Sequence, residues 1–441
     1  MFWIELLIVM LIIFWGVRKG GTFLAMAGGV GMFVLVFILH VKPSDPPVTV
    51  ILIMIAVICA SSTLQACGGL DFMVRIAEKV LRRNPKMITI MAPIVAWLFT
   101  FMCGTGHIVY SLLPVINEIA IDTGVRPERP ISASIVSSQF AITACPISAA
   151  TVATLGFVAE SPYASQINLF SLLIVAIPAT LLGTVAAALS VMKKGKELAD
   201  DPEFQRRVAA GEIEDFSKKD HTYKPATRNE KVSVAIFLTA MVAIVLMGAL
   251  SKMVLPRFAD KTTLPLTAVI EMFMLIAAAA MVVACKIDSN KMLDAPIFKT
   301  GMFAVVLAFG LCWLVNTFIG DQSKFITDNM SALTNRYPWI YIIAVFIVGA
   351  ITTSQSSTTM IMIPIGIALH LPANILIAGW MCANANFFIP ASGQCVAALA
   401  FDSAGTTKIG KYVLNHSYMV PGLVCTVVSV LTAIGLGAIV Y

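Results

Sequence analysis

The sequence has few charged residues, because Asp, Glu, Lys and Arg together make up 12% of its 441 residues. Soluble domains carry about 25%, and hydrophobic residues here reach 59%. This composition excludes an ordinary soluble domain. Six apolar runs are long enough to cross or nearly cross a bilayer, at 2–14, 22–39, 48–58, 169–192, 232–250 and 419–440. The sequence therefore predicts an all-α polytopic membrane protein whose main surroundings are the lipid bilayer.

Patterns that hold metals or disulfides are also missing. The nine cysteines form no C-x-x-C pair, and no His lies at ligand spacing from them, so they are expected to be small buried hydrophobes. Neither H-E-x-x-H nor a nucleophile elbow occurs. We therefore expect no metal site, no cofactor, no structural disulfide and no enzymatic activity. The net charge of +6 has a topological explanation, given below, and predicts no nucleic-acid partner.

One polar stretch, 193–231, interrupts the apolar chain with ten Lys/Arg and nine Asp/Glu. It separates two halves, 1–192 and 232–441, that have the same expected order of elements. In the first half we expect helices at 2–16, 22–40 and 48–63, a re-entrant hairpin at 87–122, a Pro-broken helix at 132–158 and a helix at 168–192. In the second half we expect helices at 232–250, 265–285 and 300–319, a hairpin at 338–370, a broken helix at 373–402 and a last helix at 419–440.

The distribution of cations gives this plan an orientation. If the polar linker is cytoplasmic, 24 Lys/Arg lie inside and 6 lie outside, as the positive-inside rule requires. Both termini are then periplasmic, and the first apolar run, which lacks a signal-peptide pattern, is a retained helix. Five crossings per half is an odd number, which predicts an inverted-topology repeat. Two amphipathic stretches, 64–83 and 321–336, are expected along the membrane interface.

Polar and helix-breaking residues recur at matching places in the two halves. The first hairpin turns at GTGH (104–107), and the second turns at SQSSTT (354–359). The broken helices are interrupted at Pro146 and Pro390, and Ser148 and Ser392 occupy equivalent positions after these prolines. Irregular backbone survives at membrane depth only where protein or a watery cavity lines it. Such paired interruptions indicate the substrate site of a secondary transporter.

The interruptions supply a set of candidate substrate-binding residues that is rich in neutral donors and poor in acids. Helix N-termini and hydroxyls of this kind favour a small anionic or zwitterionic substrate. For the hydroxyls, the alternative is capping of their own helices; for the prolines, it is a simple kink. His107 either contacts substrate or a coupled proton or bonds a neighbouring carbonyl. The candidates are Thr105, Gly106, His107, Ser148, Ser356, Ser357, Thr358, Asn386, Ser392 and Gln394.

Cations next to the first hairpin form a second, separate group. Arg83, Arg126 and Arg129 lie on the expected cytoplasmic side, where they would attract dianions into an inner vestibule. The positive-inside rule alone also explains them, so both interpretations stay open.

Several stretches resemble the anaerobic C4-dicarboxylate transporters of the Dcu family, the B-type member more than the A-type. They include CGTGHIVYSLLP at 103–114, RPERP at 126–130 and FDSAGTTKIGKYVLNHSYMVPG at 401–422. The resemblance runs from the first helix to the last. It implies a bacterial inner-membrane antiporter for fumarate, malate or aspartate against succinate in anaerobic respiration. It also implies kinship with an ion-transporter superfamily in which hairpin tips hold substrate and move it in an elevator-like manner.

Two segments depart from the family pattern as we know it: PASGQC at 390–395 and SQSSTT at 354–359. Both lie where substrate is expected, so they bear on substrate preference. The alternatives to exchange are a Na⁺- or H⁺-coupled symporter of the same fold and a dicarboxylate sensor or accessory protein. A second copy of the chain, forming a homodimer, and a sensor kinase stay open as protein partners.

Overall fold

The computed structural model describes residues 1–19, 22–210, 225–256, 258, 264–390, 392–409 and 415–441. Across these ranges the regular structure is helical, without a strand, which confirms the all-α prediction. Eight helical segments are long and apolar enough to cross a membrane: Val48–Ala66, Pro85–Cys103, Glu128–Ala159, Leu169–Val191, Arg228–Ala249, Leu266–Cys285, Pro296–Gln322 and Met419–Val440. Three shorter apolar helices accompany them, at Phe2–Gly16, Phe23–Ile38 and Trp339–Thr352.

In the first half, the described helices end within a few residues of the expected bounds. They are α1 Phe2–Lys19, α2 Phe23–Phe33, α3 Val48–Ala66, α4 Gly69–Arg83, α5 Ile88–Cys103, α6 Ile108–Asp122, α7 Glu128–Ala144, α8 Ala149–Ala159 and α9 Leu169–Val191. A π-helical turn, Val34–Ile38, extends α2. Within the linker, α10 spans Pro202–Ala209, and 211–224 lie outside the described residues.

The second half contains α11 Arg228–Ala249, α12 Ser251–Val254, α13 Leu266–Cys285, α14 Lys291–Asp294, α15 Pro296–Leu307, α16 Trp313–Arg336, α17 Trp339–Thr352, α18 Gln355–Ala368, α19 Ala373–Met381, α20 Gly393–Phe401 and α21 Met419–Val440. A π-helical turn, Ala308–Cys312, joins α15 to α16. One expectation differs from the structure, because 321–336 is the continuation of α16 and not a separate helix. Gly320 precedes Asp321 but does not end α16, which continues to Arg336.

The amphipathic helix α4 shows how the sequence pattern positions a helix on its neighbours. Its buried residues Gly69, Met73, Ala77 and Leu81 recur every four positions, which places them on one face. That face packs on α5, α6 and α11. Arg83 is exposed beyond it.

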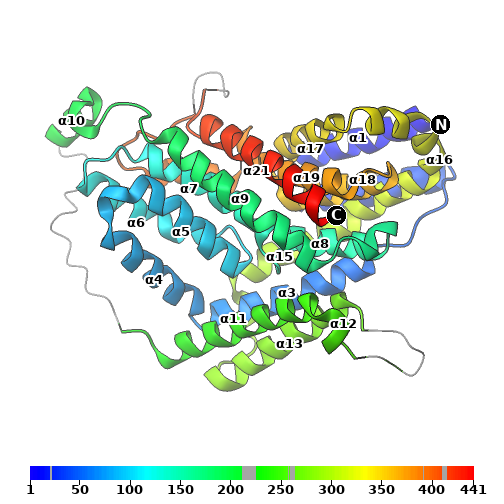
Figure 1. The fold of residues 1–441 in the computed structure, drawn as a ribbon, viewed down its shortest axis with the longest axis horizontal. Coiled ribbons are helices and arrows are strands. Elements are labelled where there is room, and N and C mark those ends of the chain that lie inside the picture. The colour runs from blue at the N-terminus through cyan, green and yellow to red at the C-terminus, as the bar shows by residue number, and fades with distance from the viewer. Residues whose placement is uncertain (20–21, 211–224, 257, 259–263, 391, 410–414) are drawn as a thin grey trace.

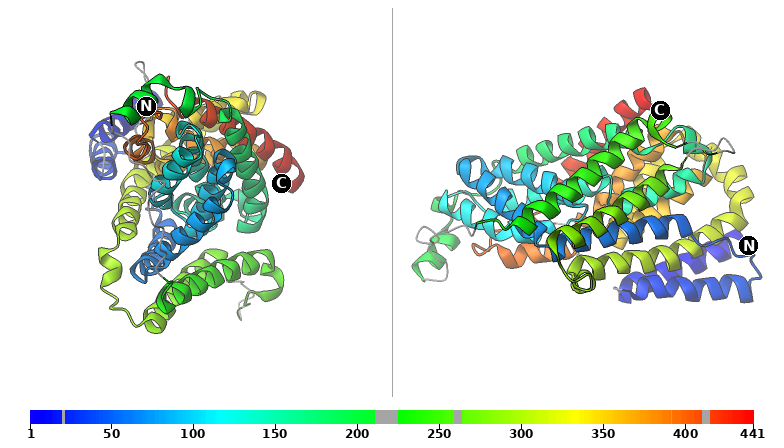
Figure 2. Two further views of the ribbon diagram at one scale, coloured as in Figure 1. Left: turned by 90° about the vertical axis from the view of Figure 1, so that its left-hand side faces the viewer. Right: turned by 90° about the horizontal axis from the view of Figure 1, so that it is seen from below.

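The helices form two packed groups (Figure 1). In one group, α5, α7, α9 and α21 lie side by side, and α19 packs on α21. In the other, α3 packs against α11, α13 and α15, in the lower part of Figure 1. The left view in Figure 2 also shows α11 and α13 apart from the other group.

The two helix hairpins point toward each other along the long axis. Figure 1 shows α5 and α6 toward the end that carries α10, and α17 and α18 toward the end that carries the N-terminus. Within each hairpin the two helices pack on each other. Their turns therefore approach from opposite ends, and the candidate site lies where they meet.

Candidate substrate-binding site

The turn between α5 and α6 is built on two glycines. Gly104 ends α5 with φ +70°, a conformation that favours glycine, and its N–H donates to Thr100 O at 2.9 Å. A Cβ on Gly106 would lie 2.2 Å from Gln394 Nε2. Without that carbon, Gln394 Nε2 donates to Gly106 O at 2.8 Å. The first turn therefore contacts α20 directly through its backbone.

The turn between α17 and α18 uses side-chain hydroxyls instead. Thr353 ends α17 with φ +49°, and Ser354 caps α18 by accepting from the Ser357 N–H at 3.3 Å. Ser357 Oγ donates to Ser354 Oγ at 2.8 Å, and Thr358 Oγ1 donates to Ser354 O at 2.8 Å. Much of the hydroxyl chemistry in this turn stabilises the start of α18.

Each proline interruption is followed by a serine-capped helix. After Pro146, Ser148 accepts from the Thr151 N–H at 3.2 Å and starts α8. After Pro390, Ser392 accepts from the Cys395 N–H at 3.4 Å and starts α20. Both helices thus begin three residues beyond the proline, and each has a capping serine directly before it.

Polar side chains connect these interruptions across the two halves. Gln139 Nε2, on α7, donates to Ser392 Oγ at 3.3 Å. Asn384 Nδ2, ahead of the second interruption, donates to Thr143 Oγ1 at 3.3 Å. Together with the Gln394–Gly106 bond, these contacts bring segments 241 to 288 residues apart into one wall.

A cavity of about 420 Å³ lies between the two turns and the second interruption. Its wall includes the first residues of three helices: Ala149 of α8, Gln355 and Ser356 of α18, and Gly393 and Gln394 of α20. The first N–H groups of a helix have no partner within it, and they carry the positive end of its dipole. No Asp or Glu occurs among the described lining residues. The cavity is therefore suited to an anion.

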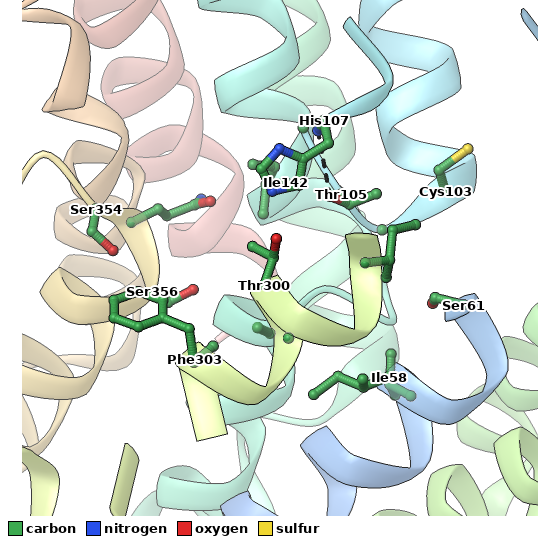
Figure 3. A pocket seen from close by; sticks show the side chains of 18 of the residues that line it. Ile58, Ser61, Cys103, Thr105, His107, Ile142, Thr300, Phe303, Ser354 and Ser356 are labelled. Carbon is green, nitrogen blue, oxygen red and sulfur yellow. Dashed lines mark hydrogen bonds between the residues drawn. The ribbon is translucent and has the colours of Figure 1, made fainter. Parts of the chain in front are cut away.

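Figure 3 shows how the two turns face the cavity. Thr105 and His107 come from the first turn, Ser354 and Ser356 come from the second, and Thr300 of α15 lies between them. The His107 side chain is exposed, and its backbone N–H donates to Thr105 Oγ1 at 3.3 Å. The imidazole is thus available to a ligand.

Most of the sequence candidates lie on the cavity wall. These are Thr105, Gly106, His107, Ser356, Asn386, Ser392 and Gln394. Ser148, Ser357 and Thr358 do not, and their hydroxyls make hydrogen bonds within the protein. Ser148 Oγ donates to Ile142 O at 2.6 Å, and the other two hydroxyls serve the α18 cap. The capping alternative therefore describes these three residues.

Several wall residues were not among the sequence candidates: Ser61, Tyr110, Thr300, Thr353, Ser354 and Gln355. Ser61 and Thr300 lie within α3 and α15, away from the hairpin turns and the proline interruptions on which the sequence prediction is based. Ser354 and Gln355 belong to the SQSSTT segment, but position in a motif does not show which side chain faces a cavity. A break in the helix would have indicated Ser61 and Thr300, but α3 and α15 continue through these residues.

Arg126 and Arg129 are 8% and 5% exposed and paired with acids. Arg126 contacts Glu128 at 2.9 Å and Asp201 at 2.6 Å. Arg129 contacts Glu197 at 2.7 Å. Because these partners compensate their charge and attach the linker to α7, both arginines have a structural role here. Arg83 is exposed and stays a candidate for the vestibule.

His416 supports the second interruption from outside the membrane-spanning helices. Its Nδ1 accepts from the Tyr418 N–H at 3.2 Å, so Nε2 carries the proton and donates to Phe388 O at 3.1 Å. Burial lowers the pKa of His416, although the contact with the Phe388 carbonyl partly offsets this effect. The neutral imidazole is therefore the form that fits.

A second cavity of about 290 Å³ adjoins the first. Both are lined by Thr105, His107, Tyr110, Ile297 and Thr300. The second continues past Asp71 of α4 to Pro296 at the start of α15. The candidate site thus extends to the start of α15.

Comparison with known proteins identifies the family. Residues 1–441 match the sequence model of the anaerobic C4-dicarboxylate membrane transporters (DcuA and DcuB). The chain is 36% identical to the anaerobic C4-dicarboxylate transporter DcuB of Escherichia coli O6:H1, over 97% of each chain. It is 38% identical to the C4-dicarboxylate transporter DcuA of Escherichia coli K12, over 99% of each, and to DcuA of Wolinella succinogenes, over 97% and 96%.

Two solved structures share the fold at low sequence identity. The YdaH transporter of Alcanivorax borkumensis aligns with a TM-score of 0.58 and 14% identity, over 87% of this chain and 84% of that one. MtrF of Neisseria gonorrhoeae, from a class of antimetabolite efflux pumps, aligns with a TM-score of 0.53 and 13% identity, over 93% and 84%. With the match over its whole length, the chain belongs to the DcuA/DcuB family of anaerobic C4-dicarboxylate membrane transporters.

Proposed function

We propose that the chain is an antiporter that exchanges C4-dicarboxylates across a bacterial inner membrane, taking up fumarate, malate or aspartate and releasing succinate. The observation that carries this proposal is the convergence of three helix N-termini, α8, α18 and α20, on a cavity without lining acids. The names of the relatives, C4-dicarboxylate transporters, supply the substrate class.

In this proposal, one dicarboxylate lies between the two turns. One carboxylate accepts from the free N–H groups at the start of α18 and from Ser356. The other accepts from the start of α20 and from the first turn, where His107 adds a donor. Dipoles of this kind hold anions without any formal charge on the protein.

Exchange would follow from the same electrostatics. An empty cavity leaves three helix N-termini uncompensated, and moving them across the membrane is unfavourable because the bilayer core cannot solvate them. A bound dianion compensates the dipoles, so the loaded site moves faster. We propose that the two halves form an inverted repeat, that the wall segments move as a unit past α3, α11, α13 and α15 in an elevator-like step, and that both termini are periplasmic.

The test is uptake of labelled succinate by proteoliposomes preloaded with fumarate, with empty vesicles as the control. We expect uptake that requires internal fumarate and is indifferent to Na⁺. Equal uptake into empty vesicles would contradict exchange, and a requirement for Na⁺ would identify a symporter instead.

A dicarboxylate sensor or accessory protein is tested separately. Because 193–210 contacts α7 through Arg126 and Arg129, deletion should be confined to 211–224. Retained exchange after this deletion would show that signalling through that segment is not the only function. Loss of exchange with normal membrane insertion would contradict a purely connecting role for it.

A further inference from the structure

The cavity wall carries hydrogen-bond acceptors whose orientation is fixed by the protein. Asn384 Nδ2 donates to Met381 O at 3.0 Å, and a carbonyl can only accept. The Asn384 amide is therefore oriented, and its Oδ1 accepts from Gln355 Nε2 at 2.6 Å. This leaves Gln355 Oε1 as the free end. It is buried without a hydrogen-bond partner on a side chain that is 5% exposed and lines the cavity.

Gln394, which follows the second interruption, is oriented in the same way. Its Nε2 donates to Gly106 O at 2.8 Å, which again accepts only, so Oε1 is the end left over. No described residue donates to that oxygen. The side chain is 9% exposed and lines the same cavity. Asn386, 7% exposed, adds an oxygen, Oδ1, that is buried like Gln355 Oε1 and has no hydrogen-bond donor among the described residues.

Buried acceptors without a donor are costly to leave unpaired. Fumarate and succinate, as dianions, carry no hydrogen-bond donor. C4-dicarboxylates with an amino or hydroxyl group on carbon 2 do carry one, close to a carboxylate that the helix N-termini can hold.

We propose that Gln355 and Gln394 are specificity-determining residues, which accept hydrogen bonds from a 2-amino or 2-hydroxy group and so favour substituted over unsubstituted C4-dicarboxylates. This assignment rests on the proposed transport function. It gives the SQSSTT and PASGQC segments a shared task, since each contributes one oriented amide.

Carbonyl oxygens also coordinate Na⁺, which is therefore the alternative ligand for these amides. The observations favour the substrate donor, because no carboxylate lines the first cavity among the described residues and Asp71 lines only the adjoining one. Gln355 and Gln394 also stand at the positive ends of α18 and α20, which disfavour a lone cation. A hydroxyl is neutral, and an α-ammonium is balanced by its own carboxylate.

The test is equilibrium competition on the full chain in nanodiscs, with labelled succinate as the probe and L-malate, L-aspartate and succinate as competitors. For the wild type we expect malate or aspartate to bind at least about tenfold more tightly than succinate. Gln355→Met removes the acceptor and should bring that ratio close to one, with little change in succinate affinity. Ser356→Ala, on the same turn of α18, is the matched control and should change all three affinities by one common factor.

Asn384→Ala is a second variant, because it frees the Gln355 amide to turn and should lower the ratio while leaving Gln355 in place. A wild-type ratio near one, or a ratio that both variants leave unchanged, would overturn the assignment. So would a Na⁺-dependent affinity that Gln355→Met abolishes for all competitors equally. If no dicarboxylate binds, the proposed function itself is contradicted. Labelled succinate without a competitor reveals this outcome, which is therefore separate from a failure of the specificity assignment.

Discussion

The two turns that meet at the cavity solve the same geometric problem with different chemistry. Each follows a helix that ends in a left-handed residue, Gly104 in the first turn and Thr353 in the second. The first turn has no room for side chains where α20 approaches, so it presents backbone. The second has room and presents hydroxyls, several of which cap its own helix. A turn's sequence is thus set by what packs on it as much as by what it binds.

The largest expected effect comes from adding one methyl group to the first turn. Gly106→Ala should lower exchange about 100-fold or more, about 2.7 kcal/mol, because its Cβ would lie 2.2 Å from Gln394 Nε2 and displace the Gln394 amide from the Gly106 carbonyl and the cavity wall. Flux in proteoliposomes with matched protein content measures this. Gly29→Ala is the control, since its Cβ meets nothing within 4 Å. Flux within threefold of wild type for Gly106→Ala would show that the close contact is dispensable.

A pair of serine variants separates capping from substrate contact. Ser148→Ala and Ser392→Ala should each destabilise the protein by about 1 kcal/mol through loss of an N-cap, measured by thermal unfolding in detergent. Only Ser392 lines the cavity, so its variant should also lose exchange about tenfold, whereas Ser148→Ala should retain it. Equal losses of flux in the two variants would contradict a separate substrate contact for Ser392.

Backbone strain distinguishes the two left-handed positions. Thr353→Gly should stabilise the protein by about 1 kcal/mol, because Thr adopts φ +49° only at a cost. Gly104→Thr should destabilise it by a similar or larger amount. Opposite shifts in unfolding temperature are the expected result, and a loss of stability in Thr353→Gly would mean that the Thr353 side chain contributes more than its backbone costs.

The smallest expected effect concerns pH. The pKa of His416 is lowered in the folded protein, so its contribution to stability is complete above the unfolded value of about 6.5. It should decline as pH falls below that value toward the lowered pKa, because the unfolded chain then binds the proton more readily. Unfolding temperature measured from pH 8 to 5 should show this decline, and His416→Gln should flatten part of it.

Sequence reasoning located the turns and interruptions because glycine and proline change backbone geometry wherever they occur. It placed Thr105, His107 and Gln394 at a common site on that basis, and they line one cavity. It did not separate facing hydroxyls from capping ones, as Ser357 and Ser356 show, because neighbouring residues of one helix point in different directions. It also missed Thr300, whose helix is ordinary in sequence and reaches the site only through packing.

The bonds across the wall join residues far apart in the chain, with separations of 241 for Asn384–Thr143 and 288 for Gln394–Gly106. During synthesis, the first half reaches the membrane well before these partners exist. Until residue 394 has been made, the carbonyl of Gly106 and the hydroxyl of Thr143 lack these contacts. A nascent or truncated chain that ends before residue 384 therefore lacks both of these bonds and holds no finished binding site.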